Sequence, residues 1–105
     1  MSTMQPIPRI PVPREAIAGL CRRYRVRRLS FFGSVIRDDF GPESDVDILL
    51  ELEPGSGIGF IGLGQMEEEL SEMLGRKVDL VTPGGLSHLF RDTVVQEAMP
   101  VYDAA

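Results

Sequence analysis

The chain has 105 residues, 43% of them hydrophobic and 26% charged, which is enough for one folded domain with a modest core and argues against global disorder. Its net charge of -5 argues against general nucleic-acid binding, which relies on a broad basic surface. Cys21 is the only cysteine, so no internal disulfide can form, and no apolar run approaches a membrane span; we therefore expect a cytoplasmic protein without a membrane segment.

The first 13 residues hold four of the eight prolines. Proline removes backbone donors, so residues 1–13 are predicted to form an extended arm before a domain of residues 14–105. Pro13 suits the first position of a helix, and apolar residues at helical spacing predict that helix over Arg14–Tyr24.

A cluster of basic residues lies at and after the end of this helix. It consists of Arg22, Arg23, Arg25, Arg27 and Arg28. Such a patch on an acidic chain suits a polyphosphate or an acidic partner, and a solvated helix end is an equal alternative. The sequence does not decide between these roles.

Two apolar runs predict neighbouring strands over Arg28–Phe32 and Val46–Glu53. Gly33 ends the first strand, and Ser34–Arg37 is expected to form a short helical turn. The segment Asp38–Glu43 is predicted to be a loop because it contains a Gly-Pro pair.

The stretch Gly55–Gly64 is rich in glycine. A loop that binds phosphate is one interpretation, but the stretch lacks the lysine and Ser/Thr of a P-loop, so a flexible connector is favoured. A helix over Leu63–Leu74 is expected to follow, with Gly75 as its end. Within it, Glu67–Glu69 is either a solvated face or a docking surface for a basic partner. Its predicted inward residues are Met66, Leu70, Met73 and Leu74.

The last third of the chain predicts a strand over Lys77–Val81 and a turn over Thr82–Gly85. A helix over Leu86–Ala98 follows, with an expected break or bend near Leu89–Thr93. Pro100–Tyr102 is predicted to be a short edge strand. Helices and strands alternate, so the expected fold class is α/β or α+β with a small mixed sheet.

Two aspartates stand in the apolar second strand. Aspartate is depleted in strands and is costly to bury without a partner. Side chains two residues apart point to the same face of a strand, so Asp45 and Asp47 should lie side by side, with the intervening apolar residues on the other face. A divalent cation, which takes hard oxygen ligands, would remove the repulsion between the two carboxylates.

Asp79 repeats this pattern between Val78 and Leu80. If its strand pairs beside the second strand, the three carboxylates and the oxygens of a phosphate would suit two magnesium ions. Taken alone, Asp79 could instead pair with Arg76 or Lys77.

The turn at Gly33 and Ser34 has the features of an anion-binding site. Glycine lets the backbone approach a ligand closely, and a helix starting at Ser34 would aim free N–H groups at an anion. The Ser34 hydroxyl can donate to a phosphate oxygen, and Arg37 can neutralise triphosphate charge. Asp45 follows Ser34 by eleven residues, a workable distance for antiparallel strands joined by a loop.

A resemblance to a known family rests on two segments, Gly33–Arg37 (Gly-Ser-Val-Ile-Arg) and Ser44–Leu50 (Ser-Asp-Val-Asp-Ile-Leu-Leu). Together they are similar to the signature of the polymerase-β-like nucleotidyltransferase superfamily, and most resemble its minimal nucleotidyltransferase (MNT) branch. Lys77–Val81 is similar to the third-carboxylate strand of that branch. The resemblance covers about Arg14–Tyr102.

The resemblance implies a small mixed sheet flanked by helices, with two Mg²⁺ ions as cofactors and ATP as substrate. The implied metal-binding and catalytic residues are Asp45, Asp47 and Asp79. The implied nucleotide-binding residues are Gly33, Ser34, Arg37 and Ser44. By position, the first two aspartates would hold both metals, and Asp79 would ligate one metal and help to activate the acceptor hydroxyl.

The implied activity is transfer of AMP from ATP to a hydroxyl of a partner protein. Many proteins of the MNT branch act as antitoxins to a HEPN-domain toxin, which implies a HEPN partner and a hetero-oligomer. Asp38 departs from the pattern because the family often has glycine there, and an acidic side chain near the triphosphate could weaken nucleotide binding. The alternative is therefore a catalytically degenerate antitoxin that neutralises its partner by binding alone. The sequence does not fix the acceptor, the nucleotide base or the oligomeric state.

Overall fold

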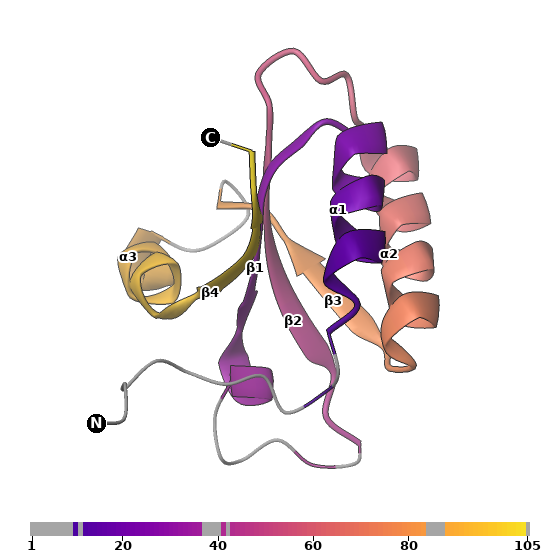
Figure 1. Ribbon diagram of the computed structural model, residues 1–105. Helices are drawn as coiled ribbons and strands as arrows, with labels where there is room; N and C mark the ends of the chain where they lie inside the picture. The colour runs from indigo at the N-terminus through magenta and orange to yellow at the C-terminus, as the bar shows by residue number, and fades with distance from the viewer. Residues whose placement is uncertain (1–9, 11, 37–40, 42, 84–87, 105) are drawn as a thin grey trace, which may run out of the picture.

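The computed structural model describes residues 10, 12–36, 41, 43–83 and 88–104 of the chain (Figure 1). Its elements are α1 (Arg14–Arg23), β1 (Val26–Phe32), the 3-10 helix η1 (Gly33–Ile36), β2 (Val46–Leu52), α2 (Phe60–Leu74), β3 (Val78–Val81), α3 (His88–Glu97) and β4 (Met99–Asp103). In the part of the chain described, no helix is both long enough and apolar enough to cross a membrane.

The four strands form one mixed sheet in the order β3-β2-β1-β4. β1 pairs antiparallel with β2 and β4, whereas β2 and β3 are parallel. Parallel strands need a long crossover, and α2 supplies it. The small mixed α+β sheet, the third strand beside the second and the C-terminal edge strand are therefore confirmed.

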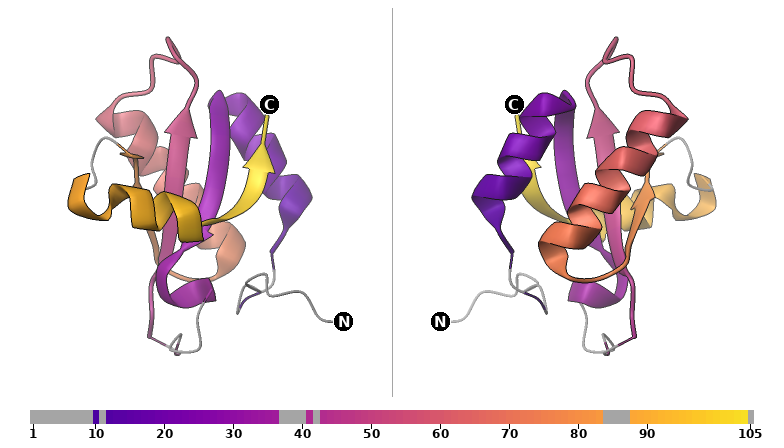
Figure 2. Two further views of the ribbon diagram at one scale, coloured as in Figure 1. Left: turned by 90° about the vertical axis from the view of Figure 1, so that its left-hand side faces the viewer. Right: turned by 90° about the vertical axis from the view of Figure 1, so that its right-hand side faces the viewer.

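The sheet has helices on both faces. Figures 1 and 2 show α1 and α2 together on one face and α3 alone on the other. The main core lies between the helix pair and the two central strands. Its buried side chains include Ile17, Leu20 and Cys21 of α1, Met66, Leu70 and Leu74 of α2, and Leu29, Phe31, Val46, Ile48 and Leu50 of the strands. Cys21 is a fully buried member of this core, and its burial raises the pKa of the thiol to about 12.

Alternation along β2 sorts its residues between the two faces of the sheet. Val46, Ile48 and Leu50 are fully buried in the core under α1 and α2, as predicted. Residues two apart share a face, so Asp47, Leu49 and Glu51 point toward the α3 face. Packing on the first face thus fixes which carboxylates appear on the second.

Several helix ends differ from the prediction. Pro13 is the N-cap of α1 rather than its first residue, and its carbonyl accepts from the Ile17 N–H at 3.0 Å. α2 begins at Phe60, three residues earlier than predicted, and the Gly59 carbonyl accepts from Leu63 N–H at 3.0 Å. The two glycines in this first turn lower its helix propensity, so the sequence pattern did not reveal that the helix begins there. Gly75 ends α2 in the left-handed region at φ 66°, as predicted.

Helix α3 corrects a second expectation. It runs without interruption from His88 to Glu97, so the predicted break at Leu89–Thr93 is wrong. Asp92 and Thr93 are exposed on this continuous helix.

The Glu67–Glu69 run is not a uniformly solvated face. Glu69 accepts from Arg23 Nη2 at 2.7 Å and from the Tyr24 hydroxyl at 2.6 Å, so it links α2 to the end of α1. The hydrogen bonds from Arg23 and Tyr24 lower the pKa of the Glu69 carboxyl. Only Glu68 of the three is exposed.

Candidate active site

Asp47 and Asp79 are direct neighbours in the sheet. They are register partners on the parallel strands β2 and β3, which places their backbones about 4.8 Å apart. Asp45 comes immediately before β2 and two residues before Asp47, on the same side of the chain by strand alternation. The predicted juxtaposition of the carboxylates on adjacent strands is confirmed for Asp47 and Asp79.

Gly33 lies against the side chain of Asp47. Phe32, the last residue of β1, is the register partner of Asp47, so the next residue turns over its carboxylate. A Cβ on Gly33 would collide with Asp47 Oδ2 and would lie 3.2 Å from its Cγ. Gly33 also has φ +74°, where a side chain is strained. This glycine is therefore needed for both its conformation and its lack of a side chain.

The three aspartates differ in exposure. Asp47 is half-buried, whereas Asp45 and Asp79 are exposed. Among the residues that the structure describes, neither Asp45 nor Asp79 makes a side-chain hydrogen bond or ion pair. The predicted alternative in which Asp79 pairs with Arg76 or Lys77 is therefore wrong.

The donor chemistry of the three aspartates fits a hard divalent cation, because all donors are carboxylate oxygens. Within the described ranges, no three acidic, histidine or cysteine side chains are close enough to hold an ion by themselves. The oxygens of a bound phosphate would therefore have to supply further ligands, as in a site shared between protein and nucleotide.

Arg76 contacts the chain just before the aspartates of β2. It lies between α2 and β3, and its guanidinium donates to the carbonyl oxygens of Gly41 and Ser44. The Ser44 hydroxyl accepts from the Gly41 N–H at 2.9 Å. The predicted nucleotide-binding residue Ser44 thus uses one acceptor position within its own turn.

The outer edge of β3 is covered by α2. Ser71 Oγ accepts from the Val78 N–H at 3.1 Å, and Glu67 Oε2 accepts from the Leu80 N–H at 3.5 Å. Ser71 and Glu67 are four residues apart on one helix face, and their donors are two residues apart on one strand. They flank Asp79 and hold its strand from the side opposite β2, a role that the sequence analysis missed.

The basic cluster lies away from the aspartates. Arg28 is near the start of β1, and Gly33 follows the end of that strand, so about 17 Å of extended chain separates them. Arg23 pairs with Glu69, and Arg28 pairs with Glu51 and Asp103. Contact between Arg28 and a nucleotide at the aspartates is therefore not supported.

Three predicted residues cannot be placed fully. Arg37 and Asp38 lie outside the described residues. Ser34 is in η1, as predicted for a short helical turn, and only its backbone is described.

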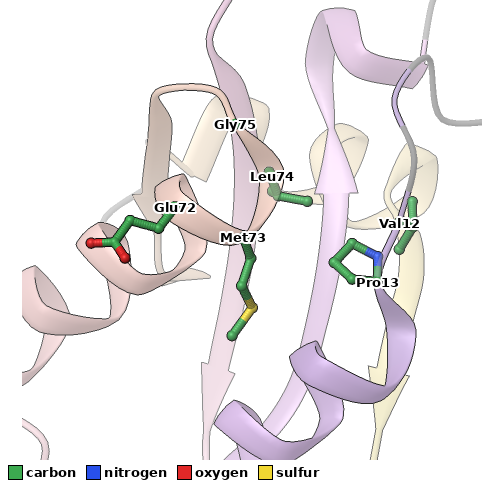
Figure 3. Close-up of a pocket in the computed structure, with 6 residues that line it drawn as sticks. All are labelled: Val12, Pro13, Glu72, Met73, Leu74 and Gly75. Atoms are coloured by element: carbon green, nitrogen blue, oxygen red, sulfur yellow. The ribbon is translucent and has the colours of Figure 1, made fainter.

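A pocket of about 410 Å³ lies elsewhere, between the start of α1 and the end of α2 (Figure 3). Its lining residues are Val12, Pro13, Glu72, Met73, Leu74 and Gly75. These helices cover the sheet face opposite Asp47, so the pocket contains none of the predicted site residues.

Comparison with known proteins assigns this chain to a family. The family described as Nucleotidyltransferase domain matches residues 13–101 of this chain. Protein adenylyltransferase MntA of Thermococcus cleftensis is 39% identical over 83 residues, which cover 78% of this chain and 81% of that protein.

Solved structures are similar over most of the chain. One named provisionally as a minimal nucleotidyltransferase has a TM-score of 0.72 at 36% identity and covers 83% of this chain and 87% of its own. A complex of a tri-AMPylated Shewanella oneidensis HEPN toxin with an MNT antitoxin gives a TM-score of 0.62 at 22% identity. That match covers 87% of this chain and 70% of the other, and at this identity it shows the fold alone.

Proposed function

This chain belongs to the nucleotidyltransferase domain family, and from that premise we propose that it transfers AMP from ATP to a hydroxyl group of a partner protein. The observation that carries the proposal is that Asp47 of β2 lies between Asp79 of β3 and Gly33, which directly follows β1. The name of the Thermococcus relative, a protein adenylyltransferase, supports protein as the acceptor class.

The partner in this proposal is a HEPN-domain protein. The support comes from the solved complex in which an AMPylated HEPN toxin accompanies an MNT antitoxin of the same fold. Asp79 is exposed on β3, an edge strand of the sheet, so a hydroxyl of another chain can reach it.

The reaction joins the acceptor oxygen to the α-phosphorus of ATP and breaks the bond from that phosphorus to the oxygen of the β-phosphate, so that pyrophosphate leaves. Asp79 is at the exposed end of the aspartate group and would take the proton of the acceptor hydroxyl. Gly33 leaves room for the Asp47 carboxylate against the turn, and the backbone N–H groups that begin η1 would bind the nucleotide phosphates.

Mg²⁺, held by Asp45, Asp47 and Asp79 together with phosphate oxygens, would stabilise negative charge on the attacking and leaving oxygens. The protein contribution is to hold carboxylates of adjacent strands at one place. The pairing of β2 with β3 fixes the positions of Asp47 and Asp79 relative to each other.

Labelled ATP tests the proposal. The chain is incubated with a HEPN partner, Mg²⁺ and ATP that carries the label on either the α- or the γ-phosphate. Transfer of the α-label alone, lost in Asp47→Asn and kept in Glu51→Gln, is the expected result. Glu51 is the matched control because it lies on the same face of β2 at the other end.

Two results would contradict the proposal. Transfer of the γ-label would indicate phosphoryl transfer instead of AMP transfer. An absence of any transfer, with neutralisation of the partner unaffected by Asp47→Asn, would identify the alternative of an antitoxin that acts by binding alone.

A further inference from the structure

Arg76 lies outside the family signature and contacts the chain just before Asp45 directly. Its Nη1 donates to the Ser44 carbonyl and to the Gly41 carbonyl, each at 3.1 Å, and its Nη2 donates to the Gly41 carbonyl at 3.1 Å. The side chain is half-buried. One guanidinium group therefore closes over two backbone oxygens on a separate segment of the chain.

The contacted turn is also closed within itself. The Ser44 N–H donates to the Gly41 carbonyl at 3.1 Å, and the Gly41 N–H donates to Ser44 Oγ at 2.9 Å. Asp45 follows this turn directly. Any movement of the turn would therefore be passed along the backbone to Asp45.

The residue after Arg76 extends the same attachment. The Lys77 carbonyl accepts from the Val46 N–H at 2.8 Å, and from there β2 and β3 pair in parallel through Asp47 and Asp79. Arg76 and Lys77 thus tie the entry of β3 to the entry of β2. The two strands that carry the carboxylates begin from one fixed point.

These contacts between the entries of β2 and β3 matter because both segments carry acids. Asp45 and Asp79 are exposed acids on the two neighbouring segments, and like charges repel each other, so other contacts must keep the two segments in register. Hydrogen bonds from a charged donor are stronger than neutral ones, and the planar fork of arginine fixes the direction of each bond. A guanidinium that donates to backbone carbonyls of another segment can therefore hold the two segments together.

We propose that Arg76 is a positioning residue that holds Ser44 and Asp45 in register with Asp79 for the binding of Mg²⁺ and ATP. The proposal rests on the proposed function, because it assigns these aspartates to a nucleotide site. It assigns Arg76 no contact with the nucleotide and no part in proton transfer.

Two measurements on Arg76→Ala test the proposal. Hydrogen exchange of the chain without ligand should become faster at the Ser44 and Val46 amides, while the central Leu50 amide stays protected. Calorimetric titration of ATP in the presence of Mg²⁺, on the chain with its HEPN partner, should show affinity weakened about 10- to 100-fold, the usual cost of losing a group that orients metal ligands.

Chemical rescue separates positioning from general stability. Millimolar guanidinium, well below denaturing concentration, should restore part of the ATP affinity of Arg76→Ala. Arg28→Ala is the matched control, because Arg28 also bridges two partners but lies at the other end of the sheet. That variant should keep wild-type ATP affinity and gain nothing from guanidinium. Arg76→Lys, which keeps the charge without the fork, provides a milder variant with an intermediate effect.

The outcomes are distinguishable. Unchanged exchange at Ser44 and Val46 in Arg76→Ala would overturn the proposal, whatever the nucleotide data show. Wild-type ATP affinity in that variant would overturn it as well. If the wild-type complex itself binds no ATP, the proposed function fails, and the exchange measurement on the free chain still decides whether Arg76 holds this segment.

Discussion

The two ends of β2 carry carboxylates on the same face of the sheet, but the residues beside these carboxylates differ. At one end, Glu51 lies opposite Arg28 in the neighbouring strand, and the guanidinium also contacts Asp103 of β4. At the other end, about 13 Å away, the register partner of Asp47 on β3 is Asp79, a second acid. Both ends are formed by paired strands, so pairing alone does not explain the difference.

The comparison separates structural acids from functional ones. The pair at Arg28 neutralises charge within the protein and leaves little for a ligand to do. The group at Asp47 keeps two exposed acids, Asp45 and Asp79, without an ion pair in the described part of the chain. Exposed carboxylates next to Asp47 can take a divalent cation as their partner, which is why this end is the candidate site.

The largest expected effect is a difference in AMP transfer between two single variants, each of which changes an acid at one of the two ends. Asp79→Asn should reduce AMP transfer by more than about a hundredfold, since it removes a metal ligand and the proposed proton acceptor and not merely a supporting group. Asp103→Asn, which changes an acid at the compensated end, should leave the transfer rate within about twofold. The rates are measured with α-labelled ATP, and equal losses in the two variants would remove the distinction between the ends.

A smaller effect is expected from a methyl group beside Asp47. Gly33→Ala and Gly75→Ala both place a side chain at positive φ, a strain of about 1–2 kcal/mol. Only Gly33 has Asp47 in the path of the new Cβ, whereas nothing lies within 4 Å of Gly75. Thermal unfolding should show a loss of stability in both variants, the larger one in Gly33→Ala because of the collision with Asp47, and ATP titration should show a loss of affinity in Gly33→Ala alone. Equal ATP affinity in the two variants would show that the contact at Gly33 does not matter.

The smallest effect is expected at the compensated end. Arg28→Ala should lower the free energy of unfolding by no more than about 1 kcal/mol, because the Arg28 side chain is 34% exposed and solvent screens its ion pairs. ATP affinity should not change. Denaturant unfolding measures the first quantity, and a loss well above this range would show that Arg28 supports the fold more than its exposure indicates.

Much of the fold follows from the sequence because the local signals agree with each other. The alternation of apolar residues in Val46–Leu50 placed three side chains in the core, and the acids between them had to face the other way. Gly75 ended α2 where a left-handed residue was expected. The juxtaposition of Asp47 with Asp79 needed one further step, the pairing of the second and third strands.

The supporting contacts of the site did not follow from the sequence because they join segments far apart in the chain. Arg76 lies 32 residues from Ser44, and nothing in the local pattern separates a contact with a distant carbonyl from a pair with nearby Asp79. Glu67 was part of an acidic run, and only the packing of α2 beside β3 shows that it accepts from the Leu80 N–H. The distant partners of long side chains cannot be identified from the periodic pattern of the sequence.

The central claim is that Asp45, Asp47 and Asp79 form a site for Mg²⁺ and ATP. Calorimetric titration of ATP into the chain with its partner, with and without Mg²⁺, tests this most directly, beside the Asp45→Asn/Asp47→Asn double variant and Glu51→Gln. The account predicts binding that requires Mg²⁺, is lost in the double variant and is retained in Glu51→Gln. Binding of equal strength in the folded double variant would contradict it, because the nucleotide would then be held somewhere other than at these aspartates.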